Sequence, residues 1–117
     1  MSAPELKRLQ KQLRDFAAVR DWDRFHAPKN LSMALAAEAA ELLEEFQWLT
    51  EAESAALDAA RLERVELEAA DVFIYLLRLA DKLGIDLIAA AERKMALNDQ
   101  KYPADKVRGD SRKYTEY

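Results

Sequence analysis

The sequence has 117 residues and contains no cysteine, only two glycines, three prolines and a single histidine. The lack of cysteine excludes disulfide scaffolds, thiolate metal sites and cysteine nucleophiles. So few glycines and prolines argue against a β-sandwich or barrel, which needs a chain reversal about every ten residues. A di-iron carboxylate bundle needs Glu-x-x-His pairs, and none occurs here. What remains is rich in alanine, leucine, glutamate and arginine, a mixture that favours helix.

The chain also lacks an excess of positive charge and any long apolar run. It has 18 basic and 22 acidic residues, which give a net charge of −4. Because duplex-binding domains are normally basic, we expect no nucleic-acid polymer as a partner. Arg78 and Lys82 interrupt the longest apolar stretch, which is too short to cross a bilayer. The N-terminus shows no apolar signal core. We therefore expect a soluble, cytoplasmic protein without a membrane partner.

The hydrophobic spacing predicts four helices, over about residues 4–19, 31–49, 54–83 and 87–101. Asn30 and Asp86 are suited to cap the second and fourth of these, and Gly84 to end the third. The third helix either runs unbroken or bends near residue 60. Short connections favour an antiparallel four-helix bundle built as one domain over residues 1–117. The tail, 104–117, lacks an apolar period and is expected to be flexible.

The segment from Val72 to Leu77 is apolar on every helical face. A helix of this kind is usually buried all round. Four short helices cannot surround it completely, so we expect contacts between subunits and an oligomeric protein.

Two pairs of carboxylates lie within apolar sequence. Glu38 and Glu41 follow a run rich in alanine, and Glu68 and Asp71 precede the most apolar stretch. Residues three apart project from the same face of a helix, so each pair presents two carboxylates side by side. If the two helices are antiparallel neighbours, all four side chains point into one shared space.

Such a cluster needs a counter-charge. Two like charges about 4 Å apart repel by roughly 4 kcal/mol at an effective dielectric constant of 20. The carboxylates must therefore take up protons, spread apart or hold a cation. Oxygen ligands without histidine or cysteine suit Mg²⁺, with Mn²⁺ as a substitute. The alternative is a set of ordinary solvated glutamates on a charged helix face, and spacing alone leaves the two interpretations balanced.

The spacing of the four acids resembles the signature of the MazG-like superfamily, the all-α nucleoside triphosphate pyrophosphohydrolases. Further blocks along nearly the whole chain resemble its dCTP pyrophosphatase branch. These blocks are Arg20-Asp21-Trp22, Phe25-His26, Pro28-x-Asn30-Leu31, Phe46-Gln47-Trp48, Asp71-Val72, Ile74-Tyr75-Leu76, Lys94-Met95, Asn98, Tyr102-Pro103-Ala104 and residues 111–116. Glu45 and Arg78 depart from the pattern, since apolar or small residues are expected at these two positions.

The resemblance implies hydrolysis of a deoxynucleoside triphosphate, dCTP or a 5-modified dCTP, to the monophosphate and pyrophosphate. Its magnesium ligands carry over onto Glu38, Glu41, Glu68 and Asp71, which we also expect to form the catalytic group. The expected nucleotide contacts are Trp22, Asp23, Arg24, Phe25, His26, Asn30, Trp48, Tyr75, Lys94, Asn98, Lys101, Arg112 and Lys113. Other substrates with the same chemistry, such as dTTP, dUTP or a non-standard nucleotide, stay open, as does a non-enzymatic helical dimerisation module.

Each of these contacts has a structural alternative. The tryptophans and Tyr75 are equally suited to a helical core, and a lone histidine is more often a structural hydrogen-bonding group than a catalyst. Lys94, Asn98 and Lys101 recur at i, i+4 and i+7, which fits either a phosphate-binding stripe or a solvated face. The aperiodic loop around Trp22 favours ligand contact, because binding residues are concentrated on loops.

Overall fold

The structure, a computed structural model, describes residues 3–109. Over this range the chain forms six α-helices and one 3-10 turn: α1 (Pro4–Val19), η1 (Asp23–Phe25), α2 (Pro28–Glu44), α3 (Glu51–Ser54), α4 (Ala59–Leu83), α5 (Leu87–Lys101) and α6 (Ala104–Val107). No strand occurs in these residues, so the predicted all-α class is confirmed. None of the described helices combines the length and the apolar character needed to cross a membrane.

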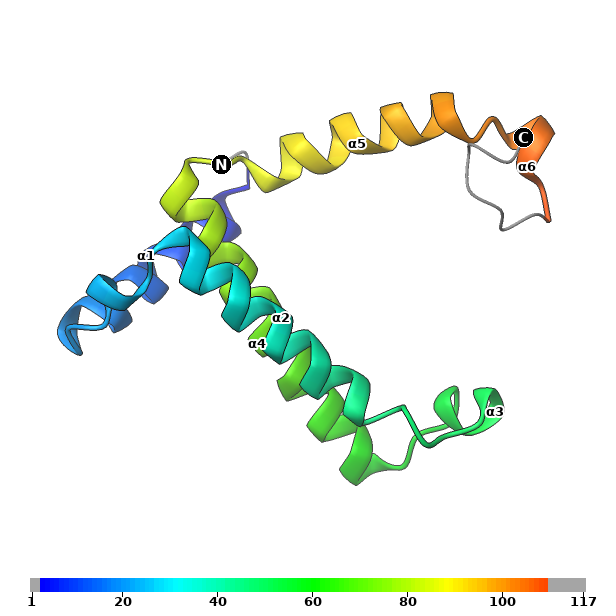
Figure 1. The fold of residues 1–117 in the computed structure, drawn as a ribbon, viewed down its shortest axis with the longest axis horizontal. Coiled ribbons are helices and arrows are strands. Elements are labelled where there is room, and N and C mark those ends of the chain that lie inside the picture. The colour runs from blue at the N-terminus through cyan, green and yellow to red at the C-terminus, as the bar shows by residue number, and fades with distance from the viewer. Residues whose placement is uncertain (1–2, 110–117) are drawn as a thin grey trace.

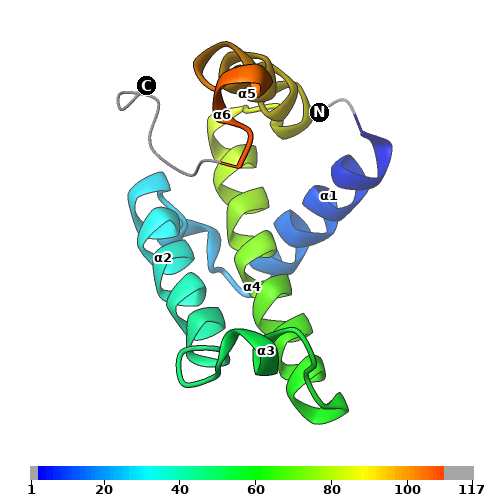
Figure 2. The ribbon, with the colours of Figure 1, turned by 90° about the vertical axis from the view of Figure 1, so that its right-hand side faces the viewer.

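The centre of the molecule is an antiparallel pair formed by α2 and α4 (Figures 1 and 2). These two helices make by far the most extensive contact in the structure. Leu31 of α2 and Leu77 of α4 are almost completely buried. The predicted alignment of the two acidic helices as neighbours is therefore correct.

Helix α1 lies against the second half of α4 and crosses it at an angle (Figures 1 and 2). Gln10 is buried in this contact, and its side-chain amide donates to the Leu77 carbonyl over 3.2 Å. Arg14 and Asp81 form an ion pair of 2.7 Å at its edge. The hydrogen bond satisfies a polar group that would be costly to bury alone.

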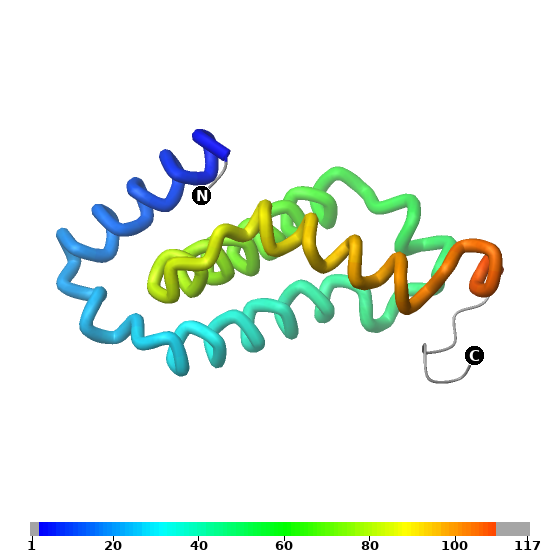
Figure 3. The backbone as a smooth tube through the Cα atoms, turned by 90° about the horizontal axis from the view of Figure 1, so that it is seen from above, coloured from blue at the N-terminus to red at the C-terminus, as the bar shows by residue number. Residues whose placement is uncertain are grey.

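Helix α5 leaves the α2–α4 pair after Gly84 and extends into solvent with α6 at its far end (Figures 1 and 3). It has no extensive contact with any other described helix. The four long helices are thus all present, but in a single chain they do not close into the expected four-helix bundle. Apolar side chains therefore stay exposed on α5 and also on α2 and α4, among them Met95, Leu43 and Phe73.

Many large apolar side chains are exposed, and the buried core is small. Only Ala17, Leu31, Leu77 and Ala80 are buried apolar residues in the described range. Phe73, inside the apolar run of α4, is 42% exposed, and Met95 on α5 is 72% exposed. Exposed apolar area on this scale is typical of interaction surfaces.

Helix α2 begins and ends at other residues than predicted. It starts at Pro28, because proline suits the first helical position, where its missing N–H is not needed. Asn30 is therefore not the cap; its side chain donates to the Phe25 carbonyl over 3.1 Å. The helix ends at Glu44, where the backbone changes to tighter i+3 hydrogen bonds, rather than at Leu49, and the Arg61 guanidinium donates to the free Glu45 carbonyl beyond its end.

The connection from α2 to α4 is built by two helix caps. Thr50 and Glu53 form a reciprocal capping box on α3, with hydrogen bonds of 2.9 and 3.1 Å. Asp58 then caps α4 by accepting from the backbone N–H of Arg61 over 2.8 Å. The stretch expected to run unbroken or to bend near residue 60 is therefore two helices, separated by the residues between Ser54 and Ala59.

The end of α4 and the start of α5 follow the predicted signals. Gly84 adopts a left-handed conformation with φ of 66° at the end of α4, and Asp86 caps α5. The short helix α6 lies in the segment expected to lack regular structure. Residues 110–117, and with them Arg112 and Lys113, lie outside the described range.

Candidate active site

Four carboxylates converge between α2 and α4. Glu38 and Glu41 come from α2, Glu68 and Asp71 come from α4, and one oxygen of each lies within 4.8 Å of those of the others. The i, i+3 spacing aligns each pair on its helix, and the antiparallel packing brings the two pairs together. The predicted acidic cluster therefore exists as a spatial group.

The electrostatics of this cluster are unfavourable without a counter-charge. The pKa of Glu38 is raised to about 7 by burial and by the neighbouring carboxylate of Glu41, with smaller contributions from Asp71 and Glu68. The pKa of Glu68 is raised for similar reasons, burial first and Glu41 second. Oε2 of Glu38 and Oε2 of Glu68 are buried and accept no hydrogen bond. Oxygens in this situation fit a hard divalent cation, which would satisfy them and remove the repulsion.

A cavity of about 320 Å³ adjoins the cluster. Asp71 belongs both to its lining and to the carboxylate group, so the two features share a wall. The remaining lining is largely apolar and aromatic, with a few polar groups: Leu13, Phe16, Ala17, Trp22, His26, Ile74, Tyr75 and Arg78. Pockets for small organic ligands have this composition.

The aromatic wall of the cavity comes from α1 and the loop after it. Trp22 packs edge-on against Phe16, with ring centroids 5.8 Å apart and an interplanar angle of 66°. The Arg20 guanidinium covers the other ring, 3.5 Å from the Phe16 centroid. Trp22 is 46% exposed, so it is not a core residue and keeps ring surface free for a ligand.

Three other predicted loop contacts are engaged with the protein itself. Asp23 accepts from Lys82 over 2.7 Å and from Arg78 over 3.0 Å, and both cations lower its pKa, Lys82 more than Arg78. Arg24 lies over the Phe25 ring, 4.8 Å from its centroid. These residues organise the loop, while Trp22, His26 and Tyr75 line the cavity.

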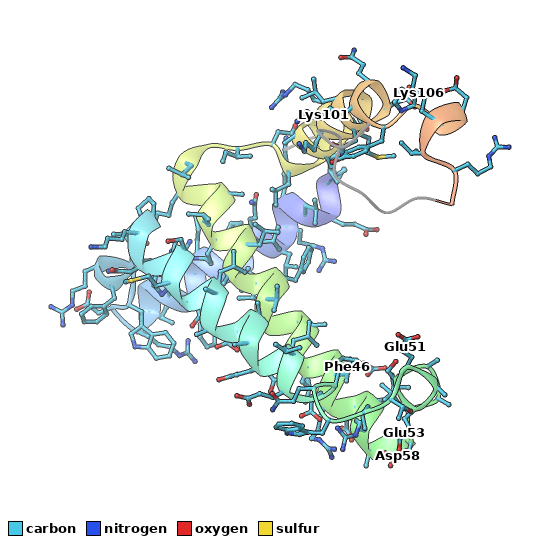
Figure 4. All side chains as sticks on the ribbon, turned by 45° about the vertical axis from the view of Figure 1, so that its right-hand side comes forward. Phe46, Glu51, Glu53, Asp58, Lys101 and Lys106 are labelled. Atoms are coloured by element: carbon cyan, nitrogen blue, oxygen red, sulfur yellow. The ribbon has the colours of Figure 1, made fainter. Side chains whose placement is uncertain are left out.

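The structure does not bring the remaining predicted contacts to this cavity. Trp48 is 87% exposed in the turn after α2, whereas Trp22 precedes that helix. A helix of 17 residues spans roughly 25 Å, so the two rings lie at opposite ends of it. Lys94, Asn98 and Lys101 are exposed on α5. Figure 4 shows Lys101 far from Phe46, at the other extremity of the molecule.

The sequence reasoning missed Leu13, Phe16, Ala17, Ile74 and Arg78 as cavity residues. Arg78 follows Tyr75 by three positions and Asp71 by seven, which places all three on one helical face. This periodicity was a usable signal. The contribution of α1 was not predictable, because an amphipathic helix shows which face it buries but not against which partner.

Comparison with known proteins gives the site a context. The MazG-like family model matches residues 33–117. Two relatives named dCTP pyrophosphatase 1, from Homo sapiens and Rattus norvegicus, are 44% and 43% identical over 115 residues, which cover 97% of this chain and 68% of theirs. The chain belongs to the MazG-like family. A solved pyrophosphatase from Archaeoglobus fulgidus is 42% identical with a TM-score of 0.75, covering 88% of this MazG-like chain and 96% of that structure.

The family assignment and the geometry agree on the class of chemistry. The relatives are enzymes that cleave pyrophosphate from nucleotides or are named pyrophosphatases, and this MazG-like chain is a nucleotide pyrophosphohydrolase. Its acidic cluster is the group that can hold a divalent metal. The predicted family membership and enzyme class are thereby confirmed.

Proposed function

We propose that this chain hydrolyses dCTP, or a dCTP modified at position 5 of the base, to the monophosphate and pyrophosphate. The observation that carries the proposal is the shared wall between the four-carboxylate cluster and the aromatic cavity. The carboxylate cluster suits a cation bound to the charged triphosphate, and the aromatic cavity suits the flat base. The relatives named dCTP pyrophosphatase 1 supply the choice of base.

We propose Mg²⁺ as the resident cation, with Mn²⁺ as a substitute, held by Glu38, Glu41, Glu68 and Asp71. The two buried oxygens without partners, on Glu38 and Glu68, support this set. When bound, the cation would neutralise charge on the phosphate oxygens and make a water molecule more acidic. The all-oxygen donor set matches the preference of these two metals.

The protein groups then have separate tasks. Trp22 and Tyr75 hold the nucleoside, and the apolar lining from Phe16 and Ile74 keeps bulk water from the cavity. A carboxylate of the cluster accepts the proton of the attacking water. In the reaction a bond forms between the water oxygen and the α-phosphorus, the bond from that phosphorus to the bridging oxygen breaks, and pyrophosphate leaves.

The predicted contacts on Trp48 and α5 require a second copy of the chain in this proposal. We propose a homodimer or homotetramer in which the apolar face of α5 is covered by another subunit. The exposed Ile88 and Met95, seven positions apart and so on one face of α5, support this assembly. In such an assembly, a nucleotide bound in the cavity of one subunit could be contacted by residues of another: Trp48, Lys94, Asn98 and Lys101. Arg112 and Lys113 belong to the same hypothesis.

The proposed unit is the whole chain, residues 1–117, acting as one domain. The alignment with the human relative over 97% of the chain supports this. Since deoxynucleoside triphosphates are made and consumed inside cells, the proposed activity also corresponds to a cytoplasmic enzyme.

The deciding experiment is a pyrophosphate-release assay with Mg²⁺ across the common nucleotides and 5-methyl-dCTP. We expect release from dCTP or its 5-modified form, and none from a Glu41→Gln variant. Preference for dTTP, dUTP or a non-standard nucleotide would change the substrate but keep the chemistry. No release from any nucleotide would favour a non-enzymatic dimerisation module.

Ligand stabilisation separates the same alternatives without turnover. Mg²⁺ together with a non-hydrolysable dCTP analogue should raise the free energy of unfolding by about 2.7 kcal/mol at a hundredfold excess over the dissociation constant. A dimerisation module would be indifferent to both additions.

A further inference from the structure

Arg78 is a buried charge on α4 at a position where the family resemblance leads one to expect a small or apolar residue. Only 3% of its surface is exposed. Its Nη2 lies 3.0 Å from Oδ1 of Asp23 and 3.1 Å from Nδ1 of His26, both in or beside η1. A buried guanidinium is costly unless it is paired, so these contacts explain how the charge is accommodated.

The surrounding charges make this contact a clamp between η1 and α4. Lys82, one turn after Arg78, also donates to Asp23, over 2.7 Å. Asp81 lies 3.5 Å from Nη1 of Arg78. The clamp, formed by Asp23, His26, Arg78 and Lys82, therefore ties the loop that carries Trp22 to the helix that carries Tyr75. These two aromatic residues both line the cavity, one from each element.

The contact with Arg78 determines the protonation of His26. A guanidinium has donors only, so the contact at Nδ1 requires that this nitrogen accept the hydrogen bond. A neutral imidazole with its proton on Nε2 meets this requirement. The pKa of His26 is lowered by burial, by Arg78 and by Lys82, while Asp23 opposes them. The charged groups that face the ring thus favour the same neutral form.

A neutral imidazole recognises different groups from a charged one. Imidazolium would attract the phosphates, whereas an Nε2–H on a neutral ring donates equally well to an uncharged oxygen or ring nitrogen. His26 lines the same cavity as Trp22 and Tyr75. Its donor therefore serves the part of a ligand that binds among the aromatic rings.

We propose that Arg78 is a positioning residue of the cavity, which holds His26 as an Nε2–H donor to an uncharged acceptor on the nucleobase or sugar. The identity of the ligand rests on the proposed function, but the clamp between Arg78 and His26 does not. Arg78 acts through His26 and contributes to recognition of the nucleoside rather than to the phosphate chemistry.

The first test is nitrogen-detected NMR of the imidazole, which is unambiguous because His26 is the only histidine. The wild-type ring should show a protonated Nε2 and an unprotonated Nδ1 at pH 7. In Arg78→Met, the two tautomers should mix and the titration midpoint should move upward. A wild-type ring with the proton on Nδ1, or a charged ring at pH 7, would overturn the proposal. Unchanged signals in Arg78→Met would do the same.

The second test is a kinetic comparison of four proteins with dCTP and Mg²⁺. Arg78→Met should raise KM about tenfold and leave kcat within about twofold, since only nucleoside binding is affected. Arg78→Lys should recover part of the loss, because lysine keeps a charged donor but not the planar fork. The control is Arg8→Met, which removes an exposed arginine from the first half of α1, outside both the acidic cluster and the cavity lining, and should leave both constants unchanged.

Two results would contradict the inference directly. If Arg78→Met lowers kcat with KM unchanged, Arg78 acts on the chemical step. If it weakens inhibition by inorganic pyrophosphate as much as binding of dCTP, Arg78 contacts phosphate. Because a misfolded fraction would lower the apparent kcat and leave KM unchanged, circular dichroism of each variant measures the folded fraction, and kcat is calculated per folded molecule. Failure of the wild-type protein to hydrolyse any nucleotide would refute the proposed function. The NMR result would still show whether Arg78 holds His26 in the Nε2–H form.

Discussion

Helices α2 and α4 pack against each other as a pair, whereas α5, called the arm below, is also long but has no extensive contact with another described helix. The pair buries Leu31 and Leu77, carries the four carboxylates and is joined to α1 by hydrogen bonds. The arm buries nothing over residues 91–100. An isolated helix of about 15 residues is marginal in water. The comparison teaches that one chain can organise the acidic cluster alone, while α5 makes no extensive contact with another helix of the described chain.

The largest expected effect concerns the pair. Glu41→Gln should lower kcat for dCTP by about two to three orders of magnitude, the size seen when one preorganised charge-stabilising group is removed. The fold should be retained, because Glu41 is exposed and the substitution relieves repulsion. Steady-state assays and circular dichroism measure the two quantities. Wild-type turnover in this variant would show that the four-carboxylate cluster does not take part in catalysis.

The second effect concerns the arm. Met95→Asp should raise the dissociation constant of the assembled protein about thirtyfold, since a charge replaces a central apolar contact. Light scattering over a dilution series measures this. Arg93→Gln, also exposed on α5, is the matched control and should leave the mass unchanged. If the wild-type protein is monomeric at all concentrations, another subunit cannot be what covers the exposed apolar residues of α5.

A third test links the two regions through Trp48. Removing a ring that stacks on a base costs about 1–3 kcal/mol, so Trp48→Ala should weaken dCTP binding about tenfold. Binding of Mg²⁺ alone should not change. Titration calorimetry gives both values. If Trp48 acts across the subunit interface, it should lose its effect in the Met95→Asp background. A full effect in that background would assign Trp48 to its own chain.

The smallest effect is a pH dependence confined to the pair. Since the pKa of Glu38 is raised from its usual 4.5 to about 7, the folded protein holds more protons than the unfolded chain between these values. The free energy of unfolding of the cation-free protein should therefore fall as the pH rises through this window. Urea unfolding in EDTA at pH 5, 6, 7 and 8 measures the slope. Glu38→Gln should flatten it, and an unchanged slope would assign the titration to other groups.

The sequence was informative where local spacing determines the outcome. The i, i+3 pairs and the antiparallel return of α4 were sufficient to predict the acidic cluster, and Gly84 and Asp86 marked their helix ends correctly. The cavity was less predictable, because Phe16 and Arg78 reach it only through the crossing of α1 over α4. The end of α2 was also predicted at the wrong residue, because residues 45–49 continue the helical pattern in sequence but form turns in the structure.

The four-helix bundle was predicted from apolar patterns that do not show whether one chain or several chains form it. Apolar periodicity shows that a helix has a face to bury, but it does not distinguish a face covered within the chain from one covered by another chain. Phe73 and Met95 carry the same apolar signal as Leu77, and only Leu77 is buried. The expectation of contacts between subunits was based on the apolar segment from Val72 to Leu77, and it remains a prediction.

The corner between the two regions rests on a single backbone angle. A methyl group at Gly84 would meet no atom within 4 Å, so space does not dictate glycine there. Its positive φ does, at about 1–2 kcal/mol for an ordinary L-residue. Replacing Gly84 should therefore change the direction in which α5 leaves α4, at a corner 13 residues beyond Asp71, and leave the acidic cluster in place.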